Sequence, residues 1–172
     1  EKIVQYVNKN TKSFSNMQID CIDTGNNSSI ANRIFKIKNK IKSFNFIFFN
    51  SNFIFNFNIK KYFRLHEDNK LDLSLLSTNI LADFGSIVIK KNKVVDFRRN
   101  AKFDKIIFDD KLKIGVVYSG IAILNKKVLN LDFKNYKNFE MQFYPKIIKK
   151  LNCKYFSPGG FWKGMDNVKE IN

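Results

Sequence analysis

The sequence predicts an α/β fold, in which a mixed, mostly parallel sheet has flanking helices and an antiparallel addition in its second half. Short apolar runs typical of strands alternate with segments whose apolar residues recur every three or four positions. Lys91-Asn92 separates two further strand-like runs and indicates a hairpin. Because 172 residues suffice for one hydrophobic core, we predict a single domain over residues 1–172.

The first half of the chain alternates helix-like with strand-like segments. Ile30, Ile34 and Ile37 follow one another at spacings of four and three, which places them on one face of a helix. The continuous apolar run 46–49 is typical of a central parallel strand covered on both faces. The predicted helices are 1–10, 30–41 and 59–68, and the predicted strands are 18–22 and 46–49.

The second half is predicted to hold more strands. Leu71, Leu73 and Leu75 alternate with polar residues as in a strand, and Pro145 suits the first turn of a short helix over 145–151. The remaining predicted strands are 86–90, 93–97 and 116–124. Ligands of α/β sheets gather at the carboxyl ends of strands, so the loops at 50–53 and 160–166 are candidate site loops.

The charge and the rare residues limit the function. A formal charge of +16 suggests phosphate-rich partners, but the lysines are spread over the whole chain and no known nucleic-acid-binding motif accompanies them. Nucleic acid is therefore a minor hypothesis. His66 is the single histidine, so we expect it to be a surface or packing residue rather than a catalyst or metal ligand. Cys21 and Cys153 lie far apart, which favours free thiols in the cytoplasm.

A membrane partner is not predicted. No apolar run approaches the roughly 20 residues that a spanning helix needs. The longest, 44–57, is interrupted by asparagines such as Asn45, Asn50 and Asn56, which are costly in hydrocarbon.

Separated short motifs follow one another in a consistent order. They are Cys21-Ile22-Asp23-Thr24-Gly25 with Asn32-Arg33, Asn58-Ile59-Lys60-Lys61, Phe84-Gly85 with Val94–Phe97, Ser119-Gly120, Phe139-Glu140, and Gly160-Phe161-Trp162 with Met165-Asp166. Together they resemble the sugar-1-phosphate nucleotidyltransferases, nearest to the glucose-1-phosphate cytidylyltransferases and with features of heptose-phosphate guanylyltransferases. The resemblance covers about residues 18–172.

The resemblance implies a nucleotidyltransferase-like, Rossmann-like fold and a transfer of a nucleoside monophosphate from a nucleoside triphosphate to a sugar 1-phosphate. It implies Mg²⁺ at Asp166 and Asn52, since this ion prefers oxygen ligands. It leaves catalytic residues unassigned. The implied nucleotide-binding residues are Thr24, Gly25, Asn32 and Arg33. The implied substrate-binding residues are Gly85, Arg99, Asn100, Ser119, Gly120, Glu140 and Trp162.

The chain departs from the family pattern at several positions. Ser51-Asn52 replaces a Gly-Asp pair whose aspartate holds the metal, and Arg99-Asn100-Ala101 replaces Glu-Lys-Pro. The family's glycine-rich triphosphate loop has no counterpart, and the chain starts at Glu1. We therefore expect the N-terminal nucleotide-binding portion to be lacking. Alternatives are a non-catalytic nucleotide or sugar-phosphate binding module, with or without a second protein chain, and a basic nucleic-acid-binding protein.

Overall fold

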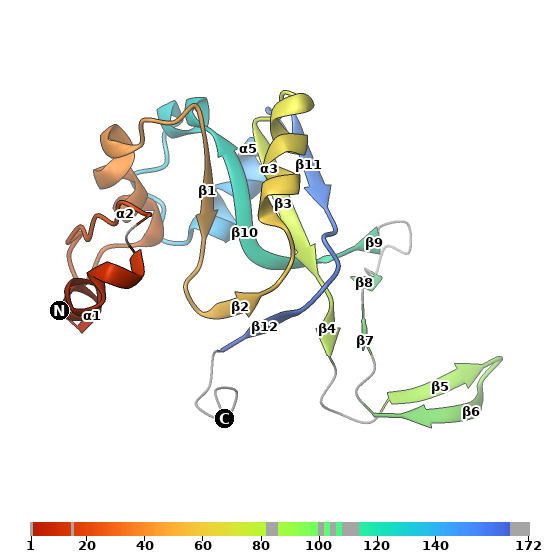
Figure 1. The fold of residues 1–172 in the computed structure, drawn as a ribbon. Helices are drawn as coiled ribbons and strands as arrows, with labels where there is room; N and C mark the ends of the chain where they lie inside the picture. Colours follow the sequence, from red (N-terminus) through yellow and green to blue (C-terminus); the bar gives the residue numbers. More distant parts are fainter. Residues whose placement is uncertain are drawn as a thin grey trace. The chain divides into compact units, whose positions relative to one another are not determined.

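A computed structural model of the chain describes residues 2–14, 16–81, 86–99, 102–103, 106–107 and 114–165 (Figure 1). The chain divides into two compact units, residues 1–42 with 131–146 and residues 43–130 with 147–172. We describe each unit by itself, and the single domain stays a prediction. Among the described residues, no helix is both long and apolar enough to cross a membrane.

The first unit is helical, and aromatic side chains pack together in its core. Helix α2 (Ile30–Ile37) buries Ala31 and Ile34, as the apolar spacing predicts. The ring of Phe143 lies 4.6 Å from that of Phe139 and 5.2 Å from that of Phe133, measured between centroids. The other elements are α1 (Lys2–Lys9), η1 (Thr11–Phe14), η2 (Lys38–Lys40), α4 (Phe139–Gln142) and, at the boundary of the units, α5 (Tyr144–Ile147).

Two predictions for this unit and its boundary need correction. Residues 18–22 form neither helix nor strand, and Ile19 and Ile22 are 40% and 39% exposed, so no sheet buries these side chains. The helix predicted over 145–151 begins at Tyr144 and ends at Ile147, after which the backbone of Leu151 bonds to the Ile147 carbonyl in a turn. Pro145 occupies its first turn as expected.

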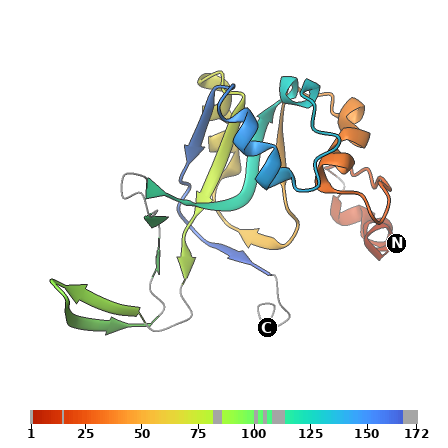
Figure 2. The same ribbon diagram turned by 180° about the vertical axis from the view of Figure 1, so that it is seen from behind.

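The second unit is built on a four-stranded mixed sheet in the order β1 (Asn45–Phe49), β10 (Val117–Asn125), β3 (Leu73–Thr78), β11 (Cys153–Phe156). Strand β10 is antiparallel to both β1 and β3, whereas β3 and β11 are parallel. Strands β1, β3 and β11 therefore run in one direction, as Figures 1 and 2 show from opposite sides. The α/β class is confirmed, but β1 is an edge strand paired antiparallel to β10, rather than the predicted central parallel strand.

Helix α3 (Ile59–Asp68) covers one face of the sheet, with the bounds that the sequence predicts. Its N-cap is Asn58, whose side chain accepts a hydrogen bond from the Lys61 amide at 3.3 Å. Tyr62 packs with Leu76 and Ile123 in the core cluster between helix and sheet. Burying such side chains is the main stabilising contribution of this layer.

His66 is a packing residue of α3, as expected. It is fully buried, and its Nδ1 lies 2.8 Å from the Ser74 Oγ on β3. Burial lowers the pKa of His66, although the charges of Glu67 and Asp72 oppose that shift.

Shorter strands complete the second unit. Lys91 and Asn92 have φ of 47° and 61°, so both central residues of the predicted hairpin turn are left-handed, which suits a two-residue hairpin loop. The paired strands are β2 (Phe53–Phe55) with β12 (Trp162–Gly164), β4 (Ile80–Leu81) with β7 (Lys102–Phe103), β5 (Ser86–Lys90) with β6 (Lys93–Arg98), and β8 (Ile106–Ile107) with β9 (Ile114–Gly115), and η3 (Lys126–Asn130) follows β10.

Candidate functional site

The loop after β1 meets the middle of β10 at one end of the sheet, which we call the bulge edge. Phe49 pairs with Ile121, and the next residue, Asn50, donates its backbone N–H to the Gly120 carbonyl at 3.2 Å. Because β1, β3 and β11 run in one direction, all three end at the bulge edge. Ligands of α/β sheets bind at such carboxyl ends of strands. The structure therefore brings loop 50–53 next to Ser119-Gly120, two stretches that the sequence analysis selected separately.

A glycine bulge interrupts β10 at this edge. Tyr118 pairs with Ser77 and Ala122 with Leu75, so a separation of four residues on β10 faces a separation of two on β3. Gly120 has φ of +81° there, which an L side chain rarely adopts. A Cβ on Gly120 would also lie 2.9 Å from Phe53 Cε1. Glycine is thus required for both conformation and space.

The neighbouring Ser119 is a structural residue of the bulge. Its side chain is fully buried, and its hydroxyl donates to the Leu76 carbonyl on β3 at 2.8 Å. We predicted that Ser119 contacts substrate. The structure shows that this hydroxyl bonds to β3, and contact of Ser119 with substrate stays a prediction.

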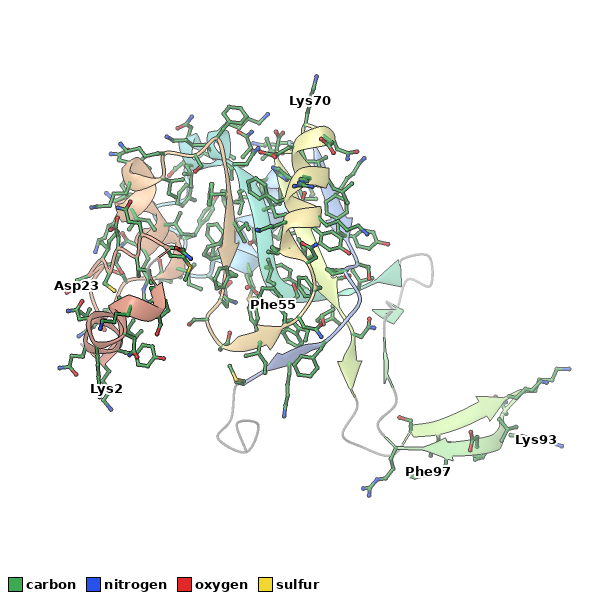
Figure 3. The ribbon with its side chains drawn as sticks, in the orientation of Figure 1. Lys2, Asp23, Phe55, Lys70, Lys93 and Phe97 are labelled. Atoms are coloured by element: carbon green, nitrogen blue, oxygen red, sulfur yellow. The ribbon has the colours of Figure 1, made fainter. Side chains whose placement is uncertain are left out.

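Trp162, near the C-terminal end of the described chain, contacts the bulge. Strand β12 pairs with β2 in an antiparallel register that sets Trp162 opposite Phe55 (Figures 1 and 3). The Trp162 Nε1–H donates to the Ser119 carbonyl at 2.9 Å. The Trp162 ring lies 5.9 Å from the Phe53 ring, which itself packs under Gly120. Trp162 therefore contacts the bulge directly by its N–H and indirectly through Phe53.

The glycine loop before β12 is fixed to the end of β2. The Asn56 side-chain oxygen accepts from the Phe161 amide at 2.7 Å, and the Asn56 amide donates to the Phe161 carbonyl at 3.1 Å. Gly160 has φ of +84°, and a Cβ on it would lie 2.9 Å from that Asn56 oxygen. Glycine at position 160 therefore permits the close approach of this loop backbone to Asn56.

The predicted metal pair lies only partly in the described chain. Met165 donates its backbone N–H to the Asn52 carbonyl at 2.7 Å, and Asn52 is exposed. Asp166 lies outside the described residues. Within the described ranges, no three His, Cys, Asp or Glu side chains gather closely enough to hold a metal ion. The Mg²⁺ site stays a prediction.

The predicted nucleotide-binding residues come together in the first unit, in the loop between residue 23 and α2. Gly25 has φ of +89°, and its amide donates to the Asp23 carboxylate at 2.8 Å. The Lys36 ammonium donates to the Thr24 carbonyl at 2.5 Å and to the Ser28 hydroxyl at 3.1 Å. Two positive side chains, Lys36 and Arg33, thus close this loop; Asp23 is labelled in Figure 3.

The first turn of α2 joins two more of these residues to the loop. Arg33 Nε donates to the Ser28 carbonyl at 2.9 Å, and the Asn32 amide donates to the N-cap hydroxyl of Ser29 at 3.2 Å. Thr24, Gly25, Asn32 and Arg33 are therefore neighbours, and their binding of nucleotide stays a prediction. Lys36 belongs with them, and its spacing of three from Arg33 on α2 was the sequence signal for it.

The other predicted substrate residues are placed less fully. Arg99 follows β6 and is exposed, and Glu140 lies exposed in the first turn of α4 in the first unit. Gly85 and Asn100 lie outside the described residues.

Sequence reasoning did not predict how three residues beside the bulge and the glycine loop support the site. Asn50, Phe53 and Asn56 hold the bulge and the glycine loop in place. The signal was present as an aromatic run interrupted by asparagine. We used the asparagines only as evidence against a membrane span, and we selected loop 50–53 only because it follows a predicted strand.

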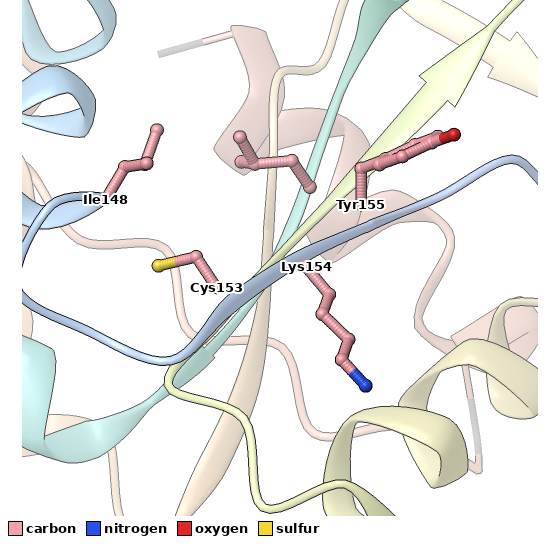
Figure 4. Close-up of a pocket in the computed structure, with 5 residues that line it drawn as sticks. Ile148, Cys153, Lys154 and Tyr155 are labelled. Carbon is pink, nitrogen blue, oxygen red and sulfur yellow. The ribbon is translucent and has the colours of Figure 1, made fainter.

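A cavity of about 450 Å³ lies elsewhere, beside the sheet edge at β11 (Figure 4). Ile148, Cys153 and Tyr155 line it together with Leu75 and Lys154. Burial, and secondly the charge of Asp72, raise the pKa of the Cys153 thiol, which keeps it protonated and a poor nucleophile. Cys153 pairs with Leu73 at the start of β3, whereas the bulge edge lies where β3 ends. The part of the cavity lined by Cys153 is therefore remote from the bulge edge.

Comparison with known proteins shows what the fold is. No protein-family model and no curated protein sequence matches the chain. Among solved structures, the chain is similar to HddC from Yersinia pseudotuberculosis, a heptose-1-phosphate guanylyltransferase, with a TM-score of 0.69, 19% identity and coverage of 99% of this chain and 71% of that one.

Two further structures agree. HddC complexed with GMP-PN matches with a TM-score of 0.64 at 20% identity, covering 98% of this chain and 70% of that one. A Bacillus anthracis protein named as a glucose-1-phosphate thymidylyltransferase, in complex with a sucrose, matches with a TM-score of 0.61 at 13% identity, covering 99% and 68%. The chain has the sugar-1-phosphate nucleotidyltransferase fold, as the motif order predicts. At these identities the likeness establishes the fold alone.

Proposed function

We propose that the chain acts in sugar-1-phosphate nucleotidyl transfer. In this reaction a phosphate oxygen of the sugar 1-phosphate bonds to the α-phosphorus of a nucleoside triphosphate. The bond from that phosphorus to the bridging oxygen of the β-phosphate breaks, and pyrophosphate leaves. The observation that supports it most is the glycine bulge at Gly120, held by Trp162 at the carboxyl edge of a nucleotidyltransferase-fold sheet.

The two ligands are assigned to different residues. The backbone of the Ser119-Gly120 bulge, whose two carbonyls are held by Trp162 and Asn50, is assigned to the sugar 1-phosphate. The loop at Thr24-Gly25, with Arg33 and Lys36, offers positive charge and amides to the triphosphate. Positive side chains neutralise phosphate charge, and rigid backbone positions it.

Asn52 and Asp166 fit a magnesium ion by their chemistry, since both provide oxygen donors and Asp166 follows directly on Met165, which bonds to Asn52. Bound Mg²⁺ would neutralise charge on the phosphates. Asn52 contributes no negative charge, so we expect weak metal binding. Cys21 and Cys153 are free thiols, and we place the protein in the reducing cytoplasm on that basis.

A pyrophosphate-release assay with Mg²⁺, four nucleoside triphosphates and several sugar 1-phosphates tests the proposal. We expect release with at least one pair of substrates. A folded sample that releases no pyrophosphate, and whose melting temperature no sugar 1-phosphate or triphosphate raises, would refute it.

A non-catalytic binding module is the second candidate, favoured by Asn52 where the family has an aspartate. It predicts stabilisation by ligands without turnover, alone or beside a second chain. Asn52→Asp distinguishes the two, because an added carboxylate should raise Mg²⁺-dependent turnover about tenfold or more if the site is catalytic. Asn56→Asp is the matched control, since its side-chain oxygen still accepts from Phe161.

A further inference from the structure

The Trp162 side chain has a polar contact that packing alone does not require. Its indole N–H donates to the Ser119 carbonyl, one residue before Gly120, across a sequence distance of 43 residues. Ser119 itself is fully buried, so water cannot readily replace a lost indole donor at its carbonyl. A carbonyl left without a partner in such a place costs free energy, and the backbone around it tends to shift.

We propose that Trp162 is a positioning residue that fixes the backbone of the Ser119-Gly120 bulge for sugar-1-phosphate binding. This inference rests on the proposed function. Trp162 acts through the bulge backbone and does not itself touch the reacting atoms.

Three contacts converge on the bulge and explain how one indole sets its geometry. Trp162 holds the Ser119 carbonyl at 2.9 Å, Asn50 holds the Gly120 carbonyl at 3.2 Å, and the Phe53 ring fills the space where a Cβ would stand. The two successive carbonyls of the bulge are therefore held from opposite partners, β12 and the loop after β1. Loss of either donor frees one peptide group of a segment already at φ +81°.

The position of Trp162 also links the bulge to the C-terminal loop. Trp162 begins β12, which ends at Gly164, and the following Met165 bonds to Asn52. One short strand thus holds the sugar-binding backbone at its first residue and the predicted metal loop just beyond its last. A change at the C-terminal loop is expected to reach the bulge through three residues of paired strand.

The single-tryptophan composition allows an unusually sharp test. Growth in a tryptophan auxotroph with benzothienylalanine replaces only Trp162, keeps the ring shape and exchanges N–H for sulfur. We expect sugar-1-phosphate affinity to fall about tenfold, the effect of one buried carbonyl losing its partner. Affinity for the triphosphate should change less than about twofold, because the indole makes no proposed contact to it.

Amide hydrogen exchange gives a readout that needs no ligand. Exchange at the Asn50 amide, which bonds to the bulge, should become about tenfold faster in the analogue protein, while exchange at Phe46, farther along the β1–β10 ladder, should stay unchanged. Trp162→Phe should give the same pattern with natural amino acids, because it keeps an aromatic ring against Phe53.

The failures are distinguishable. If the unmodified protein binds sugar 1-phosphate and the analogue binds it equally well, or if the Asn50 amide stays equally protected, the positioning inference is wrong and the proposed function stands. If the unmodified protein binds no sugar 1-phosphate, the proposed function and the inference that rests on it both fail.

Discussion

Two regions that we assign to ligands are built by opposite means. The loop in the first unit is polar and local, since the hydrogen bonds of Asp23, Arg33 and Lys36 close it between residues 23 and 36. The bulge edge of the second unit is aromatic and non-local, since Asn50, Phe53 and Trp162 converge on Gly120 from three parts of the chain. The difference implies that side-chain charge should decide the behaviour of the loop, and packing that of the bulge.

The largest expected effect is at the bulge. Gly120→Ala combines a side chain at φ +81° with a Cβ 2.9 Å from Phe53 Cε1. Strain and overpacking together should lower the free energy of unfolding by about 3 kcal/mol. Urea unfolding of the variant and the original chain measures this.

Gly159→Ala is the matched control. Gly159 also has a positive φ, +65°, but no heavy atom lies within 4 Å of a Cβ built there. It should cost only about 1 kcal/mol of backbone strain. Equal losses in the two variants would show that Phe53 does not press on the bulge, and the contrast between packed and open glycines would fail.

The next largest effect is expected from acidification, which should lower the free energy of unfolding through His66. Since burial lowers the pKa of His66, the unfolded chain takes up a proton that the folded chain resists as the pH falls below 6.5, the ordinary histidine value. Stability is therefore full above that value and is lost progressively until the pH passes the folded pKa. The midpoint of thermal unfolding between pH 8 and about pH 5 shows it.

His66→Gln removes the one side chain whose ordinary pKa lies near 6.5, because His66 is the single histidine. The pH dependence just below 6.5 should then flatten, although the variant is less stable throughout from the loss of a well-packed side chain. An unchanged slope would assign the effect to other groups.

The smallest effect on stability is expected in the polar loop. Lys36→Met removes two hydrogen bonds of a largely exposed side chain and should cost less than about 1 kcal/mol. Triphosphate affinity should nevertheless fall several-fold, about 3- to 10-fold, because a positive charge leaves the proposed site. Calorimetric titration of the triphosphate measures this.

Lys40→Met is the control for net charge, since Lys40 lies in η2 outside the loop. If both variants lower triphosphate affinity equally, general charge rather than this loop attracts the ligand. If neither does, the nucleotide-binding assignment is wrong.

The same contrast explains what the sequence allowed us to predict. Helix 59–68, the Lys91-Asn92 turn and the first part of the helix predicted over 30–41, which ends at Ile37, depend on residues close in the chain, and their patterns identified them. The edge position of β1 depends on which strands pair with it, which the apolar run at 46–49 does not encode. The strand predicted over 18–22 failed for a related reason, because a strand-like segment forms a strand only where a sheet receives it.

The candidate site shows this limit residue by residue. Motif order identified Gly120 and Trp162 as belonging to one site, but not that an indole N–H joins them. The resemblance implied that Ser119 contacts substrate, but it did not predict that the Ser119 hydroxyl bonds to the Leu76 carbonyl. Phe53 was placed in the candidate site loop 50–53, but its contact with the bulge could not be predicted, because that contact depends on the missing Cβ of a residue 67 positions later.

The central claim is that the bulge edge binds a sugar 1-phosphate. Because Trp162 is the single tryptophan and bonds to Ser119, its fluorescence reports on this edge alone. Titration with sugar 1-phosphates should change the emission saturably and with weak salt dependence. An emission that no sugar 1-phosphate changes, while single-stranded RNA binds with an affinity that falls steeply with salt, would contradict the claim and favour a basic nucleic-acid-binding protein.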